Sequence, residues 1–323
     1  MGGNPAAVAV RSHTQCLQHR PPAGHPETPA RVEEILKTLS AQAGEGWVLD
    51  PDSPLPPDDD TVGVLAWIHD KDHIERVRTV ADGADGWLDS HDCAVSAGTY
   101  RAAVAAAGLA LQAALDLVNG RIVRAFLAIR PPSHHAERDR AHGYCFFNSV
   151  AVAAEVIVRS LNAPVLIVDF DAFHGNGTQL QFYDRADVGY LSVHRYPFFP
   201  GTGGADEIGE GAGRGSTRNI PLAAGADDDV FCTALEHGLE EMGARLRPAA
   251  IVVSSGFSAF RGDPLGGMRL TEDGFRRMTA AVVTASEAWS NGRVLSILEG
   301  GYEPTGSARC ASAHIDELAA EHR

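Results

Sequence analysis

A short apolar run ends in two carboxylates and a histidine, side chains that can bind a metal or move protons. The run at 165–168 is followed by Asp169, Asp171 and His174. Open α/β proteins place their metal or catalytic sites where a buried strand ends in such groups. An Asp-x-His pair would supply two metal ligands, but the residue two positions after Asp171 is Phe173, which has no donor atom. The stretch therefore indicates a site whose metal-binding set is incomplete.

Further polar groups follow other apolar runs that lie far apart along the chain. They are His134 and His135, His194, Ser258, and the segment Gly300-Gly301-Tyr302. Because parallel strands end at the same edge of a sheet, we expect these groups to meet there. Two adjacent imidazoles can differ in basicity, which general acid–base catalysis requires.

The hydrophobic pattern predicts strands that alternate with helices. The expected strands are 8–10, 125–129, 165–169, 188–193, 250–254 and 294–298. The expected helices are 29–39, one that starts at Trp67, 98–118, 149–159, 227–245 and 272–289. Residues 51–60 and 201–215, rich in Pro, Asp or Gly, are expected to be surface loops. The alternation is typical of an α/β fold with a parallel sheet covered on both faces, and residues 1–323 are expected to form one domain.

Composition narrows the class of partner. The formal net charge of −15 argues against nucleic acid or an anionic membrane surface as the main partner. A small molecule, neutral or cationic, suits this charge better. We find no uninterrupted apolar run of about 18 residues, so we expect no membrane span. The five cysteines are scattered, which is typical of free thiols in the cytoplasm. None of these features predicts the oligomeric state.

The separated motifs together resemble the histone deacetylase superfamily, which includes the acetylpolyamine amidohydrolases. They are RPPSHHA, GYCFFNSVA, VDFDAFHGNGTQ, FFPGTG, SSGFSAFRGDPLGG and EGGY. The forms HGNGTQ and GDPLGG are closer to the class II and polyamine-amidohydrolase branch. The resemblance covers nearly the whole chain and implies an arginase–deacetylase fold, in which helices flank a central parallel sheet of about eight strands.

The resemblance also implies a role for each matching polar residue. His134 and His135 match the tandem histidines that transfer protons during attack on an amide carbonyl. Asp169 matches the buried carboxylate that orients His134, and Asn176 stands where an Asp or Asn supports His135. Tyr302 matches the tyrosine that donates a hydrogen bond to the developing oxyanion.

A second set of positions matches the family's narrow substrate tunnel. Gly143, Tyr144 and Phe199 match its walls, Leu265 its rim, and Arg31 an arginine near its inner end. Phe173 and Phe260 stand where the family has histidines, and two rings there would either only fill the space or form an apolar floor that excludes water. Ser258 is also expected to line the pocket.

The family's zinc site takes an Asp, a His and a second Asp, and this sequence departs from it at two of the three. Asp171 keeps the first ligand, Phe173 replaces the second, and Ser258 replaces the third. Catalytic zinc normally has three protein ligands, so we expect no zinc and treat Asp171 as vestigial. The family's structural potassium site depends mostly on backbone oxygens, so a potassium ion is still expected here, at Asp169, Asp171, Phe173, Ser192 and Val193.

Several functions stay open on these grounds. The first is a metal-independent enzyme, a lyase, cyclase, isomerase or activated-acyl hydrolase, that uses His134, His135 and Tyr302 on a carbonyl-bearing small molecule. The second is a catalytically inactive pseudoenzyme that acts as a binding or scaffolding module. Less favoured are a residual amide deacetylase and a different metal site built from Asp171 and a nearby histidine.

Overall fold

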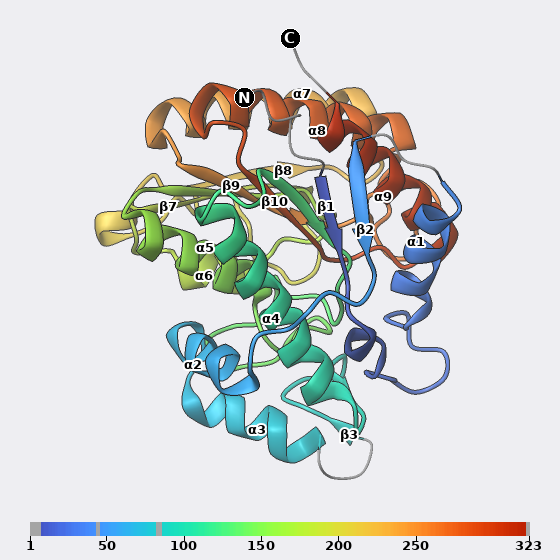
Figure 1. Cartoon of the computed structure of the whole chain (residues 1–323). Helices are drawn as coiled ribbons and strands as arrows, with labels where there is room; N and C mark the ends of the chain where they lie inside the picture. The colour runs from blue at the N-terminus through green and yellow to red at the C-terminus, as the bar shows by residue number, and fades with distance from the viewer. Residues whose placement is uncertain (1–7, 43–45, 82–85, 321–323) are drawn as a thin grey trace.

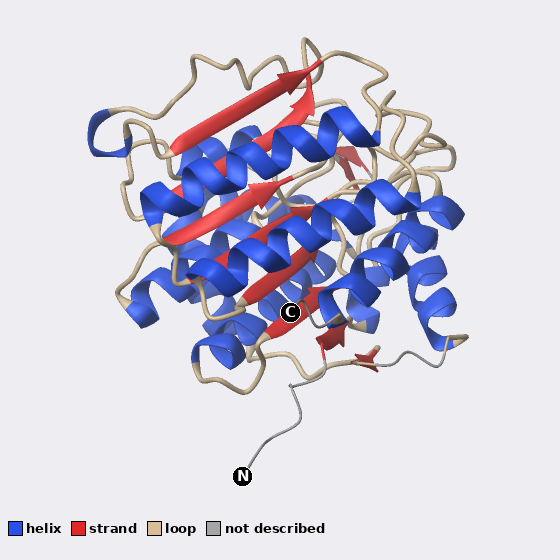
Figure 2. Ribbon diagram, turned by 90° about the horizontal axis from the view of Figure 1, so that it is seen from above, coloured by secondary structure: helices blue, strands red, loops and turns tan. Residues whose placement is uncertain are grey.

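The computed structural model describes residues 8–42, 46–81 and 86–320, and an eight-stranded sheet lies at its centre (Figure 1). Its strands are β1 (Val8–Arg11), β2 (Trp47–Asp50), β5 (Arg124–Leu127), β6 (Val165–Asp169), β7 (Val188–Arg195), β8 (Thr217–Leu222), β9 (Ala250–Ser255) and β10 (Val294–Leu298). Their spatial order is β2-β1-β5-β10-β9-β6-β7-β8, and every pair is parallel. The arrows of this sheet point the same way in Figure 2. The predicted fold is confirmed.

Helices cover both faces of the sheet. One face packs against α4 (Thr99–Val118) and α5 (Ser149–Leu161), with α2 (Asp58–Ile68) and α3 (Lys71–Ala81) outside them. The other face packs against α1 (Ala30–Ser40), α7 (Asp228–Leu246), α8 (Glu272–Trp289) and α9 (Pro304–Ala319). The short helices are α6 (Asn176–Gln181), η1 (Thr14–Leu17) and η2 (Gly211–Gly213). A small antiparallel pair joins β3 (Gly86–Trp87) and β4 (Ala94–Val95).

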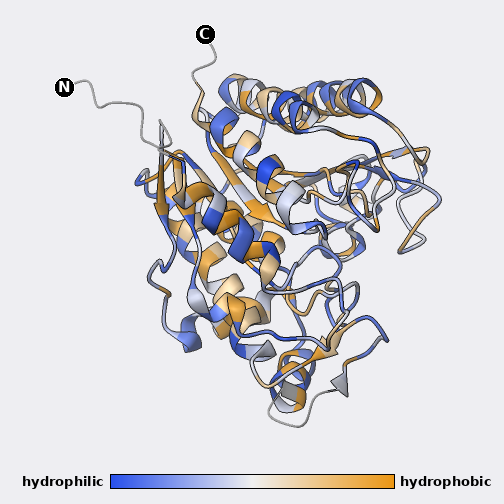
Figure 3. Cartoon of the chain, turned by 90° about the vertical axis from the view of Figure 1, so that its right-hand side faces the viewer, coloured by the Kyte–Doolittle hydropathy of each residue, from blue (hydrophilic) through white to orange (hydrophobic). Residues whose placement is uncertain are grey.

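β6, which leads into the candidate site, is buried on both faces. All five of its residues are buried. Ile167 packs into the core under α4 and α5, whereas Leu166 and Val168 pack into the core under α7 and α8. A strand with apolar side chains on both sides fits only between two helical layers. The central strands are accordingly among the hydrophobic segments coloured orange in Figure 3.

α4 lies inside the protein although its composition alone would fit a membrane. It is long and apolar enough for a span by length and composition, but 78% of its apolar window is buried within the chain. The many alanines of α4 let it pack closely against α5 and the sheet. It is a core helix.

Several predicted boundaries were wrong, and some elements were missed. The expected loop at 51–60 contains the start of α2, and the helix expected to start at Trp67 is two helices, α2 and α3. β2, β8 and α9 were not predicted. The prediction for β6 and for α8 matched the structure at both ends.

Candidate active site

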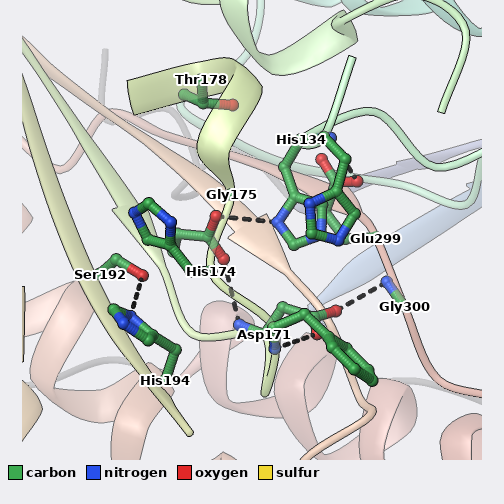
Figure 4. A network of polar contacts seen from close by, with 12 residues as sticks. His134, Asp171, His174, Gly175, Thr178, Ser192, His194, Glu299 and Gly300 are labelled. Atoms are coloured by element: carbon green, nitrogen blue, oxygen red, sulfur yellow. Dashed lines mark hydrogen bonds and ion pairs between the residues drawn. The ribbon is translucent and has the colours of Figure 1, made fainter. Parts of the chain in front are cut away.

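The carboxyl ends of the inner strands meet at one edge of the sheet and carry the polar groups selected from the sequence. Asp169 of β6 lies opposite Ser254 of β9, and β10 joins β9 to β5. The chain that leaves β5 reaches His134 and His135, and the chain that leaves β10 reaches Tyr302. The structure therefore gathers these segments in one site, part of which Figure 4 shows.

His134 is held as a cation by the carboxylates around it. Its ring Nδ1 donates to Asp169 Oδ2 at 2.9 Å, and the same oxygen accepts from the Tyr190 hydroxyl at 3.0 Å. Burial lowers the pKa of His134, but the charges of Asp169 and Glu299 outweigh it and raise that pKa to about 10. His134 therefore carries a positive charge at neutral pH.

His135 is held neutral, although its ring centre lies only 4.1 Å from that of His134. Burial, and then the adjacent His134 cation, lower the pKa of His135 well below its usual value. Its Nδ1 contacts Asn176 Oδ1 at 2.8 Å. Because an amide oxygen only accepts, the ring proton lies on Nδ1, and Nε2 keeps its lone pair. The two adjacent imidazoles thus have different protonation states, which suits a base beside a fixed positive charge.

Glu299 is a part of this site that sequence reasoning missed. Its carboxylate accepts from the Ser133 backbone N–H at 2.5 Å, from the Ser133 hydroxyl, and from the His134 N–H at 3.1 Å. Burial raises the pKa of Glu299 to about 7, against the lowering effect of His134. The sequence indicated a role for Glu299 only through its position directly before Gly300-Gly301-Tyr302, a motif already assigned to the site.

A pocket of about 230 Å³ opens onto His135. Besides His135, its lining includes Tyr302 and five of the predicted pocket residues, Gly143, Tyr144, Phe173, Phe199 and Leu265. The lining also includes Asp92 and Phe198, which the sequence reading did not select. His134 is not one of the lining residues, but its ring centre lies 4.1 Å from that of His135, which is. The walls are mainly aromatic.

The backbone at Gly143 and Tyr144 brings the wall close to His135. Both residues have positive φ, 56° and 67°. A Cβ at position 143 would overlap the His135 ring, so glycine is required there. Tyr144 tolerates a conformation that is unfavourable for a bulky residue, which is a feature of constrained functional sites.

Tyr302 is positioned from behind by charged groups. Its backbone N–H donates to Asp263 Oδ2 at 2.6 Å, and the Arg31 guanidinium lies 4.9 Å from its ring centre. Burial raises the pKa of Tyr302 well above its usual value, although Arg31 lowers it. The phenol is therefore protonated at neutral pH and able to donate a hydrogen bond into the pocket.

The family of this chain follows from its similarity to known proteins. A family model for the histone deacetylase domain matches residues 25–318. This chain belongs to the histone deacetylase family. A histone deacetylase-like amidohydrolase of Pseudomonas aeruginosa is 38% identical over 303 residues, which are 93% of this chain and 78% of that protein.

Solved structures of other family members have the same fold. The crystal structure of the HDA15 HD domain matches with a TM-score of 0.89 and 34% identity, over 98% of this chain and 89% of that one. An acetylpolyamine aminohydrolase from Burkholderia pseudomallei matches with a TM-score of 0.85 and 28% identity, over 97% and 99% of the two chains. The arginase–deacetylase fold expected from the motifs is confirmed.

The residues at the family's zinc position do not fit a zinc ion. Asp171 Oδ1 accepts from the Phe173 N–H at 3.0 Å and from the Ser258 hydroxyl. Asp171 Oδ2 accepts from the Gly300 N–H at 2.8 Å (Figure 4). Both carboxylate oxygens are therefore engaged by the protein. Within 8–42, 46–81 and 86–320, no group of three or more His, Cys, Asp or Glu side chains is arranged to hold a metal. The alternative of a site built from Asp171 and a nearby histidine gains no support.

The predicted potassium position retains suitable oxygen atoms. His194 Nε2 contacts the Gly203 carbonyl at 3.0 Å, and its Nδ1 contacts the Ser192 hydroxyl at 2.9 Å. A carbonyl only accepts, so His194 carries its proton on Nε2 and Ser192 donates to Nδ1. As a donor to His194, the Ser192 hydroxyl keeps the lone pairs of its oxygen as acceptors. With Asp169, Asp171 and the backbone carbonyls of Phe173 and Val193, Ser192 would supply the oxygen ligands that a hard cation prefers, and potassium binding stays a prediction.

Three of the predicted pocket residues lie outside the lining. Arg31 is buried and donates to the Gly301 carbonyl at 2.7 Å, to Glu27 Oε1 at 3.0 Å and to the Glu299 carbonyl. Ser258 is buried, and its hydroxyl donates to Asp171 Oδ1. Phe260 packs under the Arg309 guanidinium, 5.7 Å from its ring centre. The apolar floor expected from Phe173 and Phe260 is instead Phe173 stacked on Phe198, with ring centres 5.1 Å apart.

Proposed function

We propose that this protein is a zinc-independent enzyme that performs acid–base chemistry on a carbonyl-bearing small molecule. One observation carries the proposal: His134 and His135 keep partners that fix two different protonation states, whereas both oxygens of Asp171 accept from protein donors. The acid–base groups are thus arranged for proton transfer, whereas the metal position does not offer a zinc site.

Each group has a definite task in this proposal. The free Nε2 of His135 accepts a proton from a bound water or from a carbon acid next to a carbonyl. The neutral Tyr302 phenol donates a hydrogen bond to the oxygen on which negative charge develops. The His134 cation stabilises that charge from behind. This set could serve elimination, cyclisation, isomerisation or hydrolysis of an activated acyl group without a Lewis acid.

The pocket supports a compact substrate with an apolar end. Phe173 and Phe198 supply the floor, and Asp92 is the carboxylate in the lining. A net charge of −15 favours a neutral or cationic molecule over an anion. The Burkholderia structure is named for an acetylpolyamine, which is also small and cationic. The five cysteines are buried and unpaired, in keeping with the reducing cytoplasm.

The alternative is a pseudoenzyme that serves as a binding or scaffolding module. It is favoured by the same Asp171 contacts, because a carboxylate that ties β6 to β9 and β10 stabilises the fold without chemistry. A residual amide deacetylase is less favoured, since an unactivated amide needs the several kcal/mol that a Lewis acid supplies.

Hydrolysis assays on chelator-treated protein separate these readings. We would compare 4-nitrophenyl acetate, an activated ester, with an acetyl-lysine amide, for the parent protein, His135→Ala and Tyr302→Phe. We expect ester turnover that survives chelation and falls about 100-fold or more in His135→Ala, while the amide is not cleaved. Equal rates in all three proteins would favour the pseudoenzyme. Amide cleavage restored by zinc would favour the deacetylase.

A further inference from the structure

The Asn176 amide lies between His135 and a carboxylate that faces another pocket. Asn176 Nδ2 donates to Glu137 Oε1 at 2.6 Å, while Asn176 Oδ1 contacts His135 Nδ1 at 2.8 Å. Asn176 and His135 are 3% and 4% exposed, whereas Glu137 is half-buried. Glu137 lines a separate surface pocket of about 370 Å³ that shares no lining residue with the pocket at His135.

The direction of these hydrogen bonds follows from chemistry. A carboxylate accepts, so the NH₂ group of Asn176 must face Glu137. The Asn176 oxygen then faces His135, and only an N–H on Nδ1 satisfies it. Rotating the amide by half a turn would set two acceptors against each other at Glu137. The orientation of the amide, and with it the tautomer of His135, is therefore determined by Glu137.

The backbone of Glu137 is held firmly enough to serve this purpose. Its carbonyl accepts from His69 Nδ1 at 2.8 Å, and its N–H donates to the Arg140 carbonyl at 2.9 Å. His69 Nε2 in turn accepts from the Asn148 N–H at 2.9 Å, which leaves its proton on Nδ1. Asn148 caps α5. Glu137 is thus anchored to the start of a core helix.

We propose that Glu137 is a positioning residue that makes His135 a base. It orients Asn176, and the oriented amide holds the His135 proton on Nδ1, so that Nε2 presents its lone pair to the pocket. The arrangement differs from that of His134, whose Nδ1 meets a carboxylate directly and gains a charge. An amide between the ring and the carboxylate fixes the tautomer without adding a neighbouring negative charge.

The test is the tautomer of His135, read by ¹⁵N NMR on histidine-labelled protein. The chain has 14 histidines, and the His135 signals are those lost in His135→Gln. Glu137→Lys replaces an acceptor with a donor and should turn the amide, so that His135 becomes protonated on Nε2. Glu137→Gln keeps an acceptor oxygen and should retain the Nδ1–H form. Glu210→Lys makes the same charge change in the same surface pocket, away from the partners of Asn176, and should change nothing.

A kinetic consequence follows, which depends on the proposed function. Ester turnover should fall at least about tenfold in Glu137→Lys and recover in Glu137→Gln, while Glu210→Lys stays at the parent rate. If Glu137→Lys does not fold, Glu137→Ala should show a mixture of tautomers instead. An unchanged Nδ1–H form in the folded variant overturns this inference whatever the rate. A reversed tautomer together with an inert His135→Ala substitution overturns the proposed function alone.

Discussion

The candidate site has two halves that match the family resemblance to different degrees. In the acid–base half, His134 and His135 keep the partners that set their protonation states. In the other half, Phe173 and Ser258 stand where the family resemblance places zinc ligands. The two halves share β6, so a general loss of constraint at this strand end would have affected both. The difference fits the proposed metal-independent enzyme, which needs the acid–base groups but not the metal position.

Asp171 shows how the altered half stays stable. In a zinc site its negative charge would be balanced by the metal, whereas here it is balanced by two N–H donors and one hydroxyl. Buried carboxylates need such donors, because an unpaired charge in the interior is very unfavourable. A residue that matches a metal ligand has thus become a tie between three strands.

The largest effect is expected from rebuilding the altered half. Phe173→His together with Ser258→Asp restores the Asp, His and Asp set, and zinc affinity should rise by at least about 10⁴-fold. Calorimetric titration with zinc checks this, with Ser258→Asp alone as the matched control, which should bind weakly. A folded double variant that binds no zinc would show that the two halves differ in more than their ligands.

The acid–base half predicts a pH dependence of stability. Burial lowers the pKa of His134, but Asp169 and Glu299 raise it from 6.5 to about 10. The folded state therefore binds the proton more tightly, so the stabilisation is present below about pH 6.5 and is lost as pH rises through about 10. Its full size is up to about 5 kcal/mol. Glu299, with a pKa raised by burial to about 7, acts in the same direction at lower pH.

Urea unfolding of the parent and of His134→Gln between pH 7.5 and 10 measures this contribution. The free energy of unfolding should fall with pH in the parent and be much flatter in the variant. Parallel slopes would mean that His134 is neutral in the folded protein, and the contrast between the two imidazoles would then disappear.

Removing the carboxylate of Asp171 should lower the free energy of unfolding. Asp171→Ala leaves the N–H groups of Phe173 and Gly300 and the Ser258 hydroxyl without their acceptor, at a cost of about 3 kcal/mol. Urea unfolding at pH 7 measures it. A variant as stable as the parent would show that Asp171 is not a structural tie.

The smallest effect is expected for Ser258→Ala. It removes one donor to Asp171 while leaving the Phe173 and Gly300 bonds in place, so the loss should be about 1 kcal/mol. Neither the His135 tautomer nor ester turnover should change. A large fall in turnover would place Ser258 in the chemistry and join the two halves into one site.

The sequence predicted the inner part of the fold better than its edges. β6 was located correctly at both ends because it is a continuous apolar run that must be buried. β8 was missed because Thr217–Leu222 begins with three polar residues and contains a proline, which is tolerated in an edge strand. The start of α2 was assigned to a loop because three consecutive aspartates look solvated, although acidic residues favour a helix N-terminus.

Site residues were predicted when they lie in a contiguous sequence motif. They were missed when only their contacts in the folded protein place them at the site. Tyr302 and the two histidines were found from their neighbours in sequence. Phe198 and Asp92 were not, because their place in the pocket depends on how loops from different strands pack. Arg31 was assigned to the tunnel, but its guanidinium donates to two backbone carbonyls and to Glu27. No spacing in the sequence indicates these contacts.

The most direct test of the metal-independent pocket is the zinc content of protein purified from zinc-supplemented cells, measured together with chelator-resistant ester turnover. We predict substoichiometric zinc in the parent protein, the same content in Asp171→Asn, and turnover that chelation does not reduce. One tightly held zinc per chain that is lost in Asp171→Asn, with turnover that disappears on its removal, would contradict the account.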